Sequence, residues 1–237
     1  MPRTIDLNAD LGEGYPWDLA LLGRVTSAGV CCGAHAGDRS TSLRTLRWAE
    51  GLGVVVGAHP GYPDRENFGR DERWIDDPAH LAALGDEVHR QVAELRRLAE
   101  EAGATLRFVK AHGALYNRAQ VSGEVAVPLV TAVADRGLPI LGQPGGLVEK
   151  LARTMGVPFI AEGFADRRYL PDGRLVPRTE PDAILRDPAE IRAQVLALVD
   201  RGIRTLCIHG DDPGSVELAD LVLATLNDAG IEPRGFA

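Results

Sequence analysis

Four of the six histidines occupy similar places in the chain, each just after an apolar run that is typical of a β-strand. They are His35, His59, His112 and His209. Histidine moves protons near neutral pH and binds metal ions, so four of them at strand ends indicate one shared functional site. His80 and His89 fall instead in a long amphipathic stretch, where we expect surface or helix-packing roles.

The segment VKAHGALYN (109–117) adds a lysine to this pattern. Lys110 and His112 are two residues apart at the end of a strand-like run, so their side chains should point to the same side. Lys150 is the only other lysine in the sequence. Because a buried, unpaired ammonium is unfavourable, we expect Lys110 to have an anionic partner, either Asp6, Asp10 or a bound anion.

Two further strand-like runs alternate polar and apolar residues. Their polar members are Asp6, Asn8 and Asp10 in IDLNAD (5–10), and His209 and Asp211 in CIHGD (207–211). The outer face of an α/β barrel packs on helices and is apolar, so these polar side chains should face the interior near its mouth. They would then share a cavity with Lys110 and His112.

This set of residues is compatible with two mechanisms. The first is a metal-assisted hydrolase, in which Asp10 and two or three of the histidines hold zinc or a similar ion. The second is metal-free acid–base catalysis on an amide or carboxylate substrate. In either case an arginine from the segments FGRDER and FADRRY, or Arg178, would hold negative charge together with Lys110. The candidates are Arg70, Arg167, Arg168 and Arg178.

Strand-like and helix-like stretches alternate along the whole chain. The predicted strands are 4–9, 25–32, 53–59, 105–112, 138–143, 158–163 and 204–210. The predicted helices are 40–52, starting on a Ser40 cap, and 77–103, 122–137, 145–156, 187–202 and 214–230. Repeated β–α units imply parallel strands with helical crossovers, and their number favours a closed or nearly closed barrel. We expect one α/β barrel domain over 1–237, with segments 60–76 and 164–186 as lids or insertions.

The composition excludes several classes of protein. The formal net charge is −8 and no basic cluster occurs, so we expect no nucleic-acid partner. No apolar run approaches the ~20 residues that span a bilayer, so we expect no membrane association. The N-terminal residues lack the apolar core of a signal peptide, which favours a cytoplasmic location. The cysteine count of 3 is odd, which argues against a disulfide framework.

Several motifs together resemble one known family. They are IDLNADLGEGY, CGAHAGD, VVVGAHPGYPDRENFGR, VKAHGALYN, AEGFADRRY and CIHGDDP, in this order from about residue 4 to 213. The sequence is similar to the LamB/YcsF family, the A subunit of prokaryotic 5-oxoprolinase. Ala111 stands where the family pattern has a proline, and Ala34 stands where it has an aromatic residue. Both differences concern local shape more than chemistry.

The resemblance implies a (β/α)7-like barrel of the TIM type, related to the glycoside hydrolase and deacetylase barrels. It also implies ATP-dependent opening of 5-oxo-L-proline to L-glutamate by a complex with separate B and C subunits, in which ATP is a co-substrate. The chain has no GxxxxGK[ST] loop, so any nucleotide contact here would be unconventional. The alternatives are a metal-dependent carbohydrate deacetylase or amidohydrolase, and a non-catalytic partner subunit.

We assign roles to the candidate residues from their positions, because the resemblance does not settle them. The predicted catalytic residues are Asp10, His59, Lys110, His112 and His209. The predicted substrate-binding residues are Asn8, Glu13, His35, Arg70, Tyr116, Arg167 and Asp211. If a divalent metal binds, its expected ligands are Asp10, His59 and His112.

Overall fold

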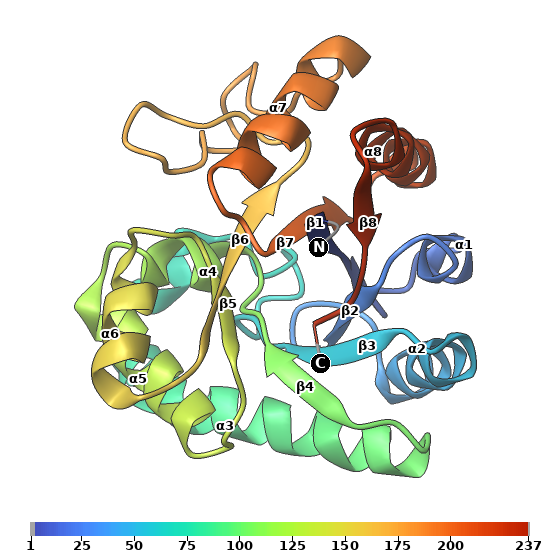
Figure 1. Ribbon diagram of the computed structural model, residues 1–237. Helices are drawn as coiled ribbons and strands as arrows, with labels where there is room; N and C mark the ends of the chain where they lie inside the picture. Colours follow the sequence, from blue (N-terminus) through green and yellow to red (C-terminus); the bar gives the residue numbers. More distant parts are fainter. Residues whose placement is uncertain (1–2, 237) are drawn as a thin grey trace.

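The computed structural model describes residues 3–236, which form a closed barrel of parallel strands ringed by helices (Figure 1). The barrel strands are β1 (Arg3–Leu11), β2 (Ser27–Cys31), β3 (Val55–His59), β4 (Leu106–Val109), β5 (Ile140–Gly142), β6 (Phe159–Phe164) and β7 (Thr205–His209). Each strand pairs with the next, and β1 pairs with both β7 and β2, which closes the ring. The predicted (β/α)7-like barrel is confirmed.

The helices cover the outside of the barrel. They are α1 (Asp18–Leu22), α2 (Arg39–Leu52), α3 (Pro78–Glu101), α4 (Gly113–Ala119), α5 (Gly123–Ala134), α6 (Leu147–Met155), α7 (Pro188–Asp200) and α8 (Ser215–Asp228). The predicted Ser40 cap of α2 is wrong. Asp38 is the cap, because its carboxylate accepts a hydrogen bond from the backbone N–H of Thr41 at 2.8 Å and the helix begins at Arg39.

Four short elements were not predicted from the sequence: α1, α4, the 3₁₀ helix η1 (Glu72–Asp76) and strand β8 (Ile231–Pro233). All are too short to show a clear periodic pattern. Strand β8 lies outside the closed ring, where it pairs with the first residues of β1. Within residues 3–236, none of the helices combines the length and the apolar character that crossing a membrane would require.

Large side chains fill the interior of the barrel below Lys110. Phe108 of β4 is completely buried there, and its ring meets the Phe236 ring edge-on, with the centroids 5.2 Å apart. Gly57 of β3 leaves the space that the Phe108 ring occupies, because a Cβ at this position would overlap the ring. The close fit makes this end of the barrel a packed core without a channel.

The exchange Gly57→Ala should therefore destabilise the protein. Overpacking a filled interior costs about 1–3 kcal/mol, and a protein of this size loses roughly 2–4 °C in melting temperature per kcal/mol. Gly51→Ala is the matched control, since Gly51 is an exposed residue of α2 and an added Cβ would meet nothing within 4 Å. Thermal melts should show a loss for Gly57→Ala and none for Gly51→Ala. Equal melting temperatures would contradict the packing described here.

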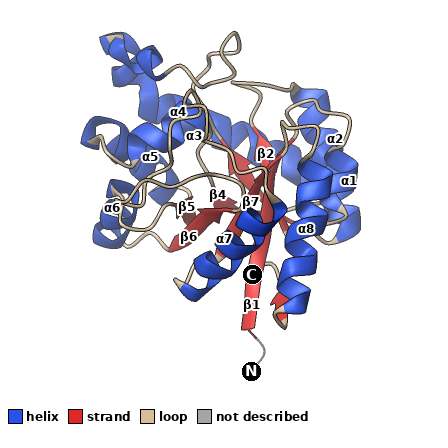
Figure 2. Cartoon of the chain, turned by 90° about the horizontal axis from the view of Figure 1, so that it is seen from above, coloured by secondary structure: helices blue, strands red, loops and turns tan. Residues whose placement is uncertain are grey.

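The two long segments that were predicted to be lids or insertions lie at the opposite end of the barrel. Figure 2 shows β1 running away from the N-terminus towards the side where the loops gather. Residues 60–76 include η1. Phe164 ends β6, and residues 165–186 are irregular except for two isolated bridges, Arg167 with Ile184 and Tyr169 with Leu175. Both segments supply walls to the cavity at this end.

Candidate active site

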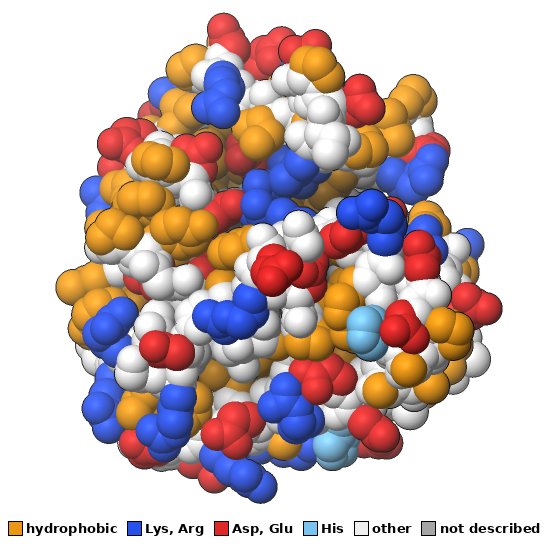
Figure 3. Space-filling view, turned by 180° about the vertical axis from the view of Figure 1, so that it is seen from behind, with side chains coloured by type: hydrophobic (Ala, Val, Ile, Leu, Met, Phe, Trp, Pro, Cys, Tyr) orange, Lys and Arg blue, Asp and Glu red, His pale blue; other side chains and the backbone are white. Residues whose placement is uncertain are grey.

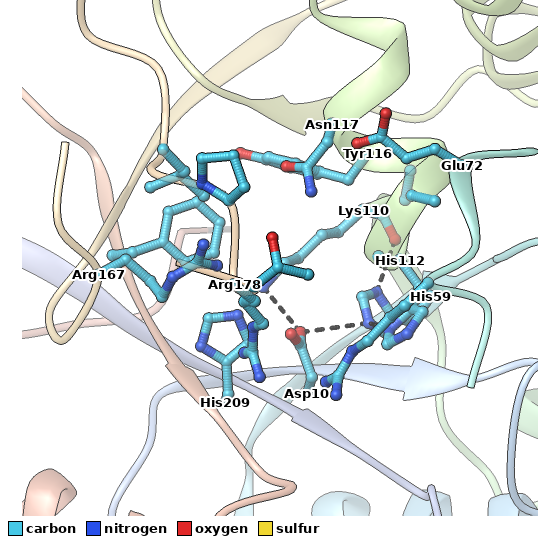
Figure 4. Close-up of a pocket in the computed structure, with 18 residues that line it drawn as sticks. Asp10, His59, Glu72, Lys110, His112, Tyr116, Asn117, Arg167, Arg178 and His209 are labelled. Carbon is cyan, nitrogen blue, oxygen red and sulfur yellow. Dashed lines mark hydrogen bonds and ion pairs between the residues drawn. The ribbon is translucent and has the colours of Figure 1, made fainter. Parts of the chain in front are cut away.

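A cavity of about 540 Å³ opens at the carboxyl ends of the barrel strands. All five residues predicted to be catalytic line it: Asp10, His59, Lys110, His112 and His209. Of the predicted substrate-binding residues, Arg70, Tyr116 and Arg167 line it as well, whereas Asn8, Glu13, His35 and Asp211 do not. The expectation that three strand-end histidines share one pocket with Asp10 is thereby confirmed in geometry (Figure 4).

Lys110 is completely buried and has two carboxylate partners. Its ammonium lies 2.7 Å from Asp10 Oδ1 and 2.9 Å from Glu162 Oε1, and it donates a hydrogen bond to Asn8 Oδ1 at 3.0 Å. Glu162 was not among the predicted site residues. Asp6, the other predicted partner, instead accepts hydrogen bonds from the hydroxyls of Thr26, Ser27 and Thr205 deeper in the barrel.

The charges of this group reinforce one another. Burial acts to raise the pKa of Asp10, but attraction to His59, which is charged only in acid, and to the ammonium of Lys110 lowers it below its ordinary value. Burial likewise opposes the charge on Lys110, yet Asp10 above all raises the pKa of its ammonium well above the ordinary value. Both groups are therefore ionised at neutral pH, and Lys110 holds a fixed positive charge at the cavity wall.

Asn8 lies beneath this group and has no surface on the cavity. Its side chain is fully buried, and its amide donates hydrogen bonds to Thr205 Oγ1 at 2.7 Å and Glu162 Oε1 at 3.2 Å. The structure therefore corrects the predicted substrate-binding role: Asn8 positions Lys110 and Glu162 from below.

Three histidines form a compact group beside Asp10. The His35 and His112 rings are stacked, 3.7 Å apart and 5° from parallel, and the His59 ring is nearly perpendicular to that of His112. His59 Nε2 lies 3.0 Å from His112 Nδ1 and 3.6 Å from Asp10 Oδ1. Burial lowers the pKa of all three imidazoles, that of His59 to about 4, so they are uncharged at neutral pH.

His209 faces the cavity from the other side of Asp10, across from His59 (Figure 4). Its Nδ1 lies 3.6 Å from Asp166 Oδ1, a carboxylate that was not among the predicted site residues. Burial and the nearby Arg178 lower the pKa of His209, and Asp166 partly opposes that shift. A neutral imidazole with a carboxylate nearby is suited to accept a proton from water or substrate.

Arginines gather at the cavity. Figure 3 shows Lys or Arg side chains in a hollow on the face opposite to that of Figure 1. Arg70 and Arg178 both pair with Asp211, at 2.5 and 3.4 Å, so Asp211 positions these two side chains although it does not line the cavity. Arg167 is buried, and its guanidinium donates to the backbone oxygen of Val176. Burial lowers the pKa of Arg167 to about 10, so it stays charged.

Comparison with known proteins identifies the relatives of this chain. Residues 5–237 match the LamB/YcsF family. The chain belongs to this family. A protein of Mycolicibacterium paratuberculosis, named as the A subunit of 5-oxoprolinase, is 45% identical, with 98% of each chain covered. The crystal structure of the Lactam Utilization Protein from Thermus thermophilus is 36% identical, covers 98% of this chain and 100% of its own, and superposes with a TM-score of 0.89.

More distant structures share only the fold of this LamB/YcsF protein. A polysaccharide deacetylase from Bacillus cereus has a TM-score of 0.58 at 11% identity, and covers 99% of this chain and 92% of its own. The predicted relation to the deacetylase barrels is thus seen in the fold.

Three acidic residues in or near the cavity of this LamB/YcsF protein were missed as site residues: Glu162, Asp166 and Glu72. Glu162 carried a usable signal, because it alternates with apolar neighbours near the end of β6, as Asp10 does in β1. Asp166 and Glu72 lie beyond strand ends in the two long segments, where no periodicity indicates the direction of a side chain.

Proposed function

We propose that this chain is the A subunit of an ATP-dependent 5-oxoprolinase and acts with separate B and C subunits. The observation that carries the proposal is the similarity, over nearly the full length of both chains, to proteins that bear this name. The reaction would be hydrolysis of a cyclic amide, 5-oxo-L-proline, to L-glutamate, with ATP converted to ADP and phosphate by the complex. A cytoplasmic location stays a prediction.

The cavity supports this proposal with two kinds of charged group. Arg167 and Arg178 provide guanidinium groups for the carboxylate of the lactam, since arginine matches the planar shape of a carboxylate. Lys110 lies on another part of the wall, where its ammonium would stabilise negative charge that develops on the lactam oxygen.

The proposed chemistry requires water to add to the lactam carbonyl carbon and the C–N bond to break. His209, with Asp166 nearby, would take the proton from water, and the ring nitrogen would leave as the amine after gaining a proton. A five-membered lactam loses little entropy by staying closed, so its hydrolysis gains less free energy than that of an open amide. Phosphorylation of the amide oxygen by ATP would supply the missing driving force and a better leaving group.

The alternative of a metal-dependent carbohydrate deacetylase is not favoured. The deacetylase structures resemble this chain at 11–15% identity, which reflects the shared barrel alone. The relatives at 40–45% identity all carry the 5-oxoprolinase name.

The proposal predicts that glutamate forms only with the complete enzyme. The purified chain should be assayed with 5-oxo-L-proline alone, with B and C subunits, and with or without ATP and a chelator. We expect little or no turnover by the chain alone or without ATP, and robust turnover by the three subunits with ATP. Equal turnover by B and C without this chain would refute the proposal, and robust turnover by the chain alone would refute the requirement for partners.

A further inference from the structure

The hydrogen bonds of His59 and His112 fix which ring nitrogens carry hydrogen. His59 Nδ1 lies 2.8 Å from the backbone oxygen of Lys110, and His112 Nε2 lies 2.9 Å from the backbone oxygen of Phe68. A carbonyl oxygen only accepts, so both of these nitrogens must be the N–H donors. In the neutral rings the other two nitrogens, His59 Nε2 and His112 Nδ1, then carry lone pairs, and they face each other at 3.0 Å.

A carboxylate oxygen lies next to one of these two lone pairs, that of His112, and also next to His35. Glu13 Oε1 lies 3.4 Å from His112 Nδ1 and 3.3 Å from His35 Nε2. Glu13, His35, His59 and His112 each bring a possible ligand atom within 4.8 Å of the others, and all four residues are buried. Electron-rich atoms at these separations repel one another unless a proton or a metal cation lies between them.

We propose that Glu13, His59 and His112 bind a divalent transition-metal ion such as Zn²⁺ at the cavity wall. Two imidazoles and one carboxylate form a common set for such ions, and they leave a coordination position open. Bond lengths of about 2.0–2.2 Å in tetrahedral geometry place ligand atoms roughly 3.3–3.6 Å apart. The separations of 3.0 Å between the two nitrogens and 3.4 Å from Glu13 to His112 are close to this range.

Ring orientation decides which histidines belong to the site. Imidazole lone pairs lie in the ring plane, and the rings of His59 and His112 are 86° apart, so their lone pairs can converge on one ion. His35 is parallel to His112 at 3.7 Å, so its lone pairs cannot reach the same point. His35 is a positioning residue that donates through Nε2 to Glu13, as outer-shell partners of metal ligands do.

Asp10 and His209 do not belong to this site either. Asp10 Oδ1, the atom nearest to His59, is already 2.7 Å from the Lys110 ammonium. A second group of possible metal ligands consists of Asp10, Cys207 and His209. The Lys110 ammonium lies 2.9 Å from Cys207 Sγ, so this group already has a positive charge beside it. The proposed site thus replaces the predicted ligand Asp10 with Glu13 and keeps His59 and His112.

Metal binding can be measured without any turnover. The chelator-treated chain should be titrated with Zn²⁺ by calorimetry, with the stoichiometry checked by elemental analysis. We expect the original chain to bind one Zn²⁺. The affinity for Zn²⁺ should be at least ~100-fold weaker in Glu13→Gln, His59→Gln and His112→Gln, because losing a ligand should cost at least as much as losing a residue that only supports a ligand. His35→Gln should weaken binding less, by about 10-fold.

Two controls make the result specific. His89→Gln alters an exposed histidine of α3, and His209→Gln alters the rival cluster. Both should bind Zn²⁺ like the original chain, and circular dichroism should show that the variants are folded. Absence of binding by the original chain, or equal binding by Glu13→Gln and His59→Gln, would overturn the proposal. Selective loss in His209→Gln would overturn it as well, by assigning the ion to the other cluster. None of these outcomes bears on the proposed lactam reaction, because that reaction is tested separately by glutamate formation.

Discussion

Replacing Lys110 with methionine is expected to lower glutamate formation by the assembled enzyme by about 100-fold or more. The exchange keeps the aliphatic stem and removes the buried positive charge at the cavity wall. Loss of a charged group that stabilises the transition state has effects of this size. The measurement is steady-state turnover of 5-oxo-L-proline with ATP and the B and C subunits.

The same variant should lose about 3–5 kcal/mol of stability, because it leaves Asp10 and Glu162 buried without their shared partner. Lys150→Met is the matched control, since Lys150 is exposed in α6 and should change neither property. Adding Glu162→Gln to Lys110→Met should restore part of the stability and none of the activity. Near-normal turnover in Lys110→Met would show that the lysine has no part in the reaction.

Replacing His209 with glutamine is expected to lower turnover by about 10²–10⁴-fold, the usual contribution of a general base. The reason is that glutamine has no nitrogen lone pair that accepts a proton. His89→Gln, on the surface of α3, is the control for histidine loss as such. Full activity in His209→Gln would remove this residue from the catalytic group.

The pH profile tests the same role through Asp166. Burial and Arg178 lower the pKa of His209, so the neutral base persists below the ordinary histidine value and kcat/KM should fall only as the pH drops through that lowered pKa. Asp166 opposes the lowering, so Asp166→Asn should move the acid limb to still lower pH. His209→Gln should abolish the limb. An acid limb at the same pH in all three proteins would assign it to another group.

Strand periodicity predicted much of the candidate site. Lys110 and His112 follow β4, His209 ends β7 and Asp10 lies one residue before the end of β1. A parallel barrel brings all such ends to one mouth. The alternation in β1 correctly placed Asp10 inside. The alternation did not show how far each side chain lies from the mouth of the barrel. Asn8, two residues before Asp10, lies below the cavity because two residues span about 7 Å along a strand.

Contacts between distant strands could not be read from the sequence. Lys110 is paired with Glu162 as well as Asp10 because the barrel places β4, β6 and β1 around one interior. No local sequence pattern shows how close the side chains of these three strands lie to one another. The irregular segments posed a different difficulty. Phe68 takes a left-handed conformation, with φ of 57°, which aims its carbonyl oxygen at His112, and no pattern indicates such a conformation for phenylalanine.

The most direct test of the proposed reaction is a titration of this chain into fixed, excess B and C subunits with ATP and 5-oxo-L-proline. The rate of glutamate formation should start near zero, rise in proportion to the added chain and level off at a constant ratio of subunits. The Lys110→Met chain, checked for folding, should give almost no rise. A rate that does not depend on the added chain, or that rises equally with both chains, would contradict the claim that the reaction uses this cavity.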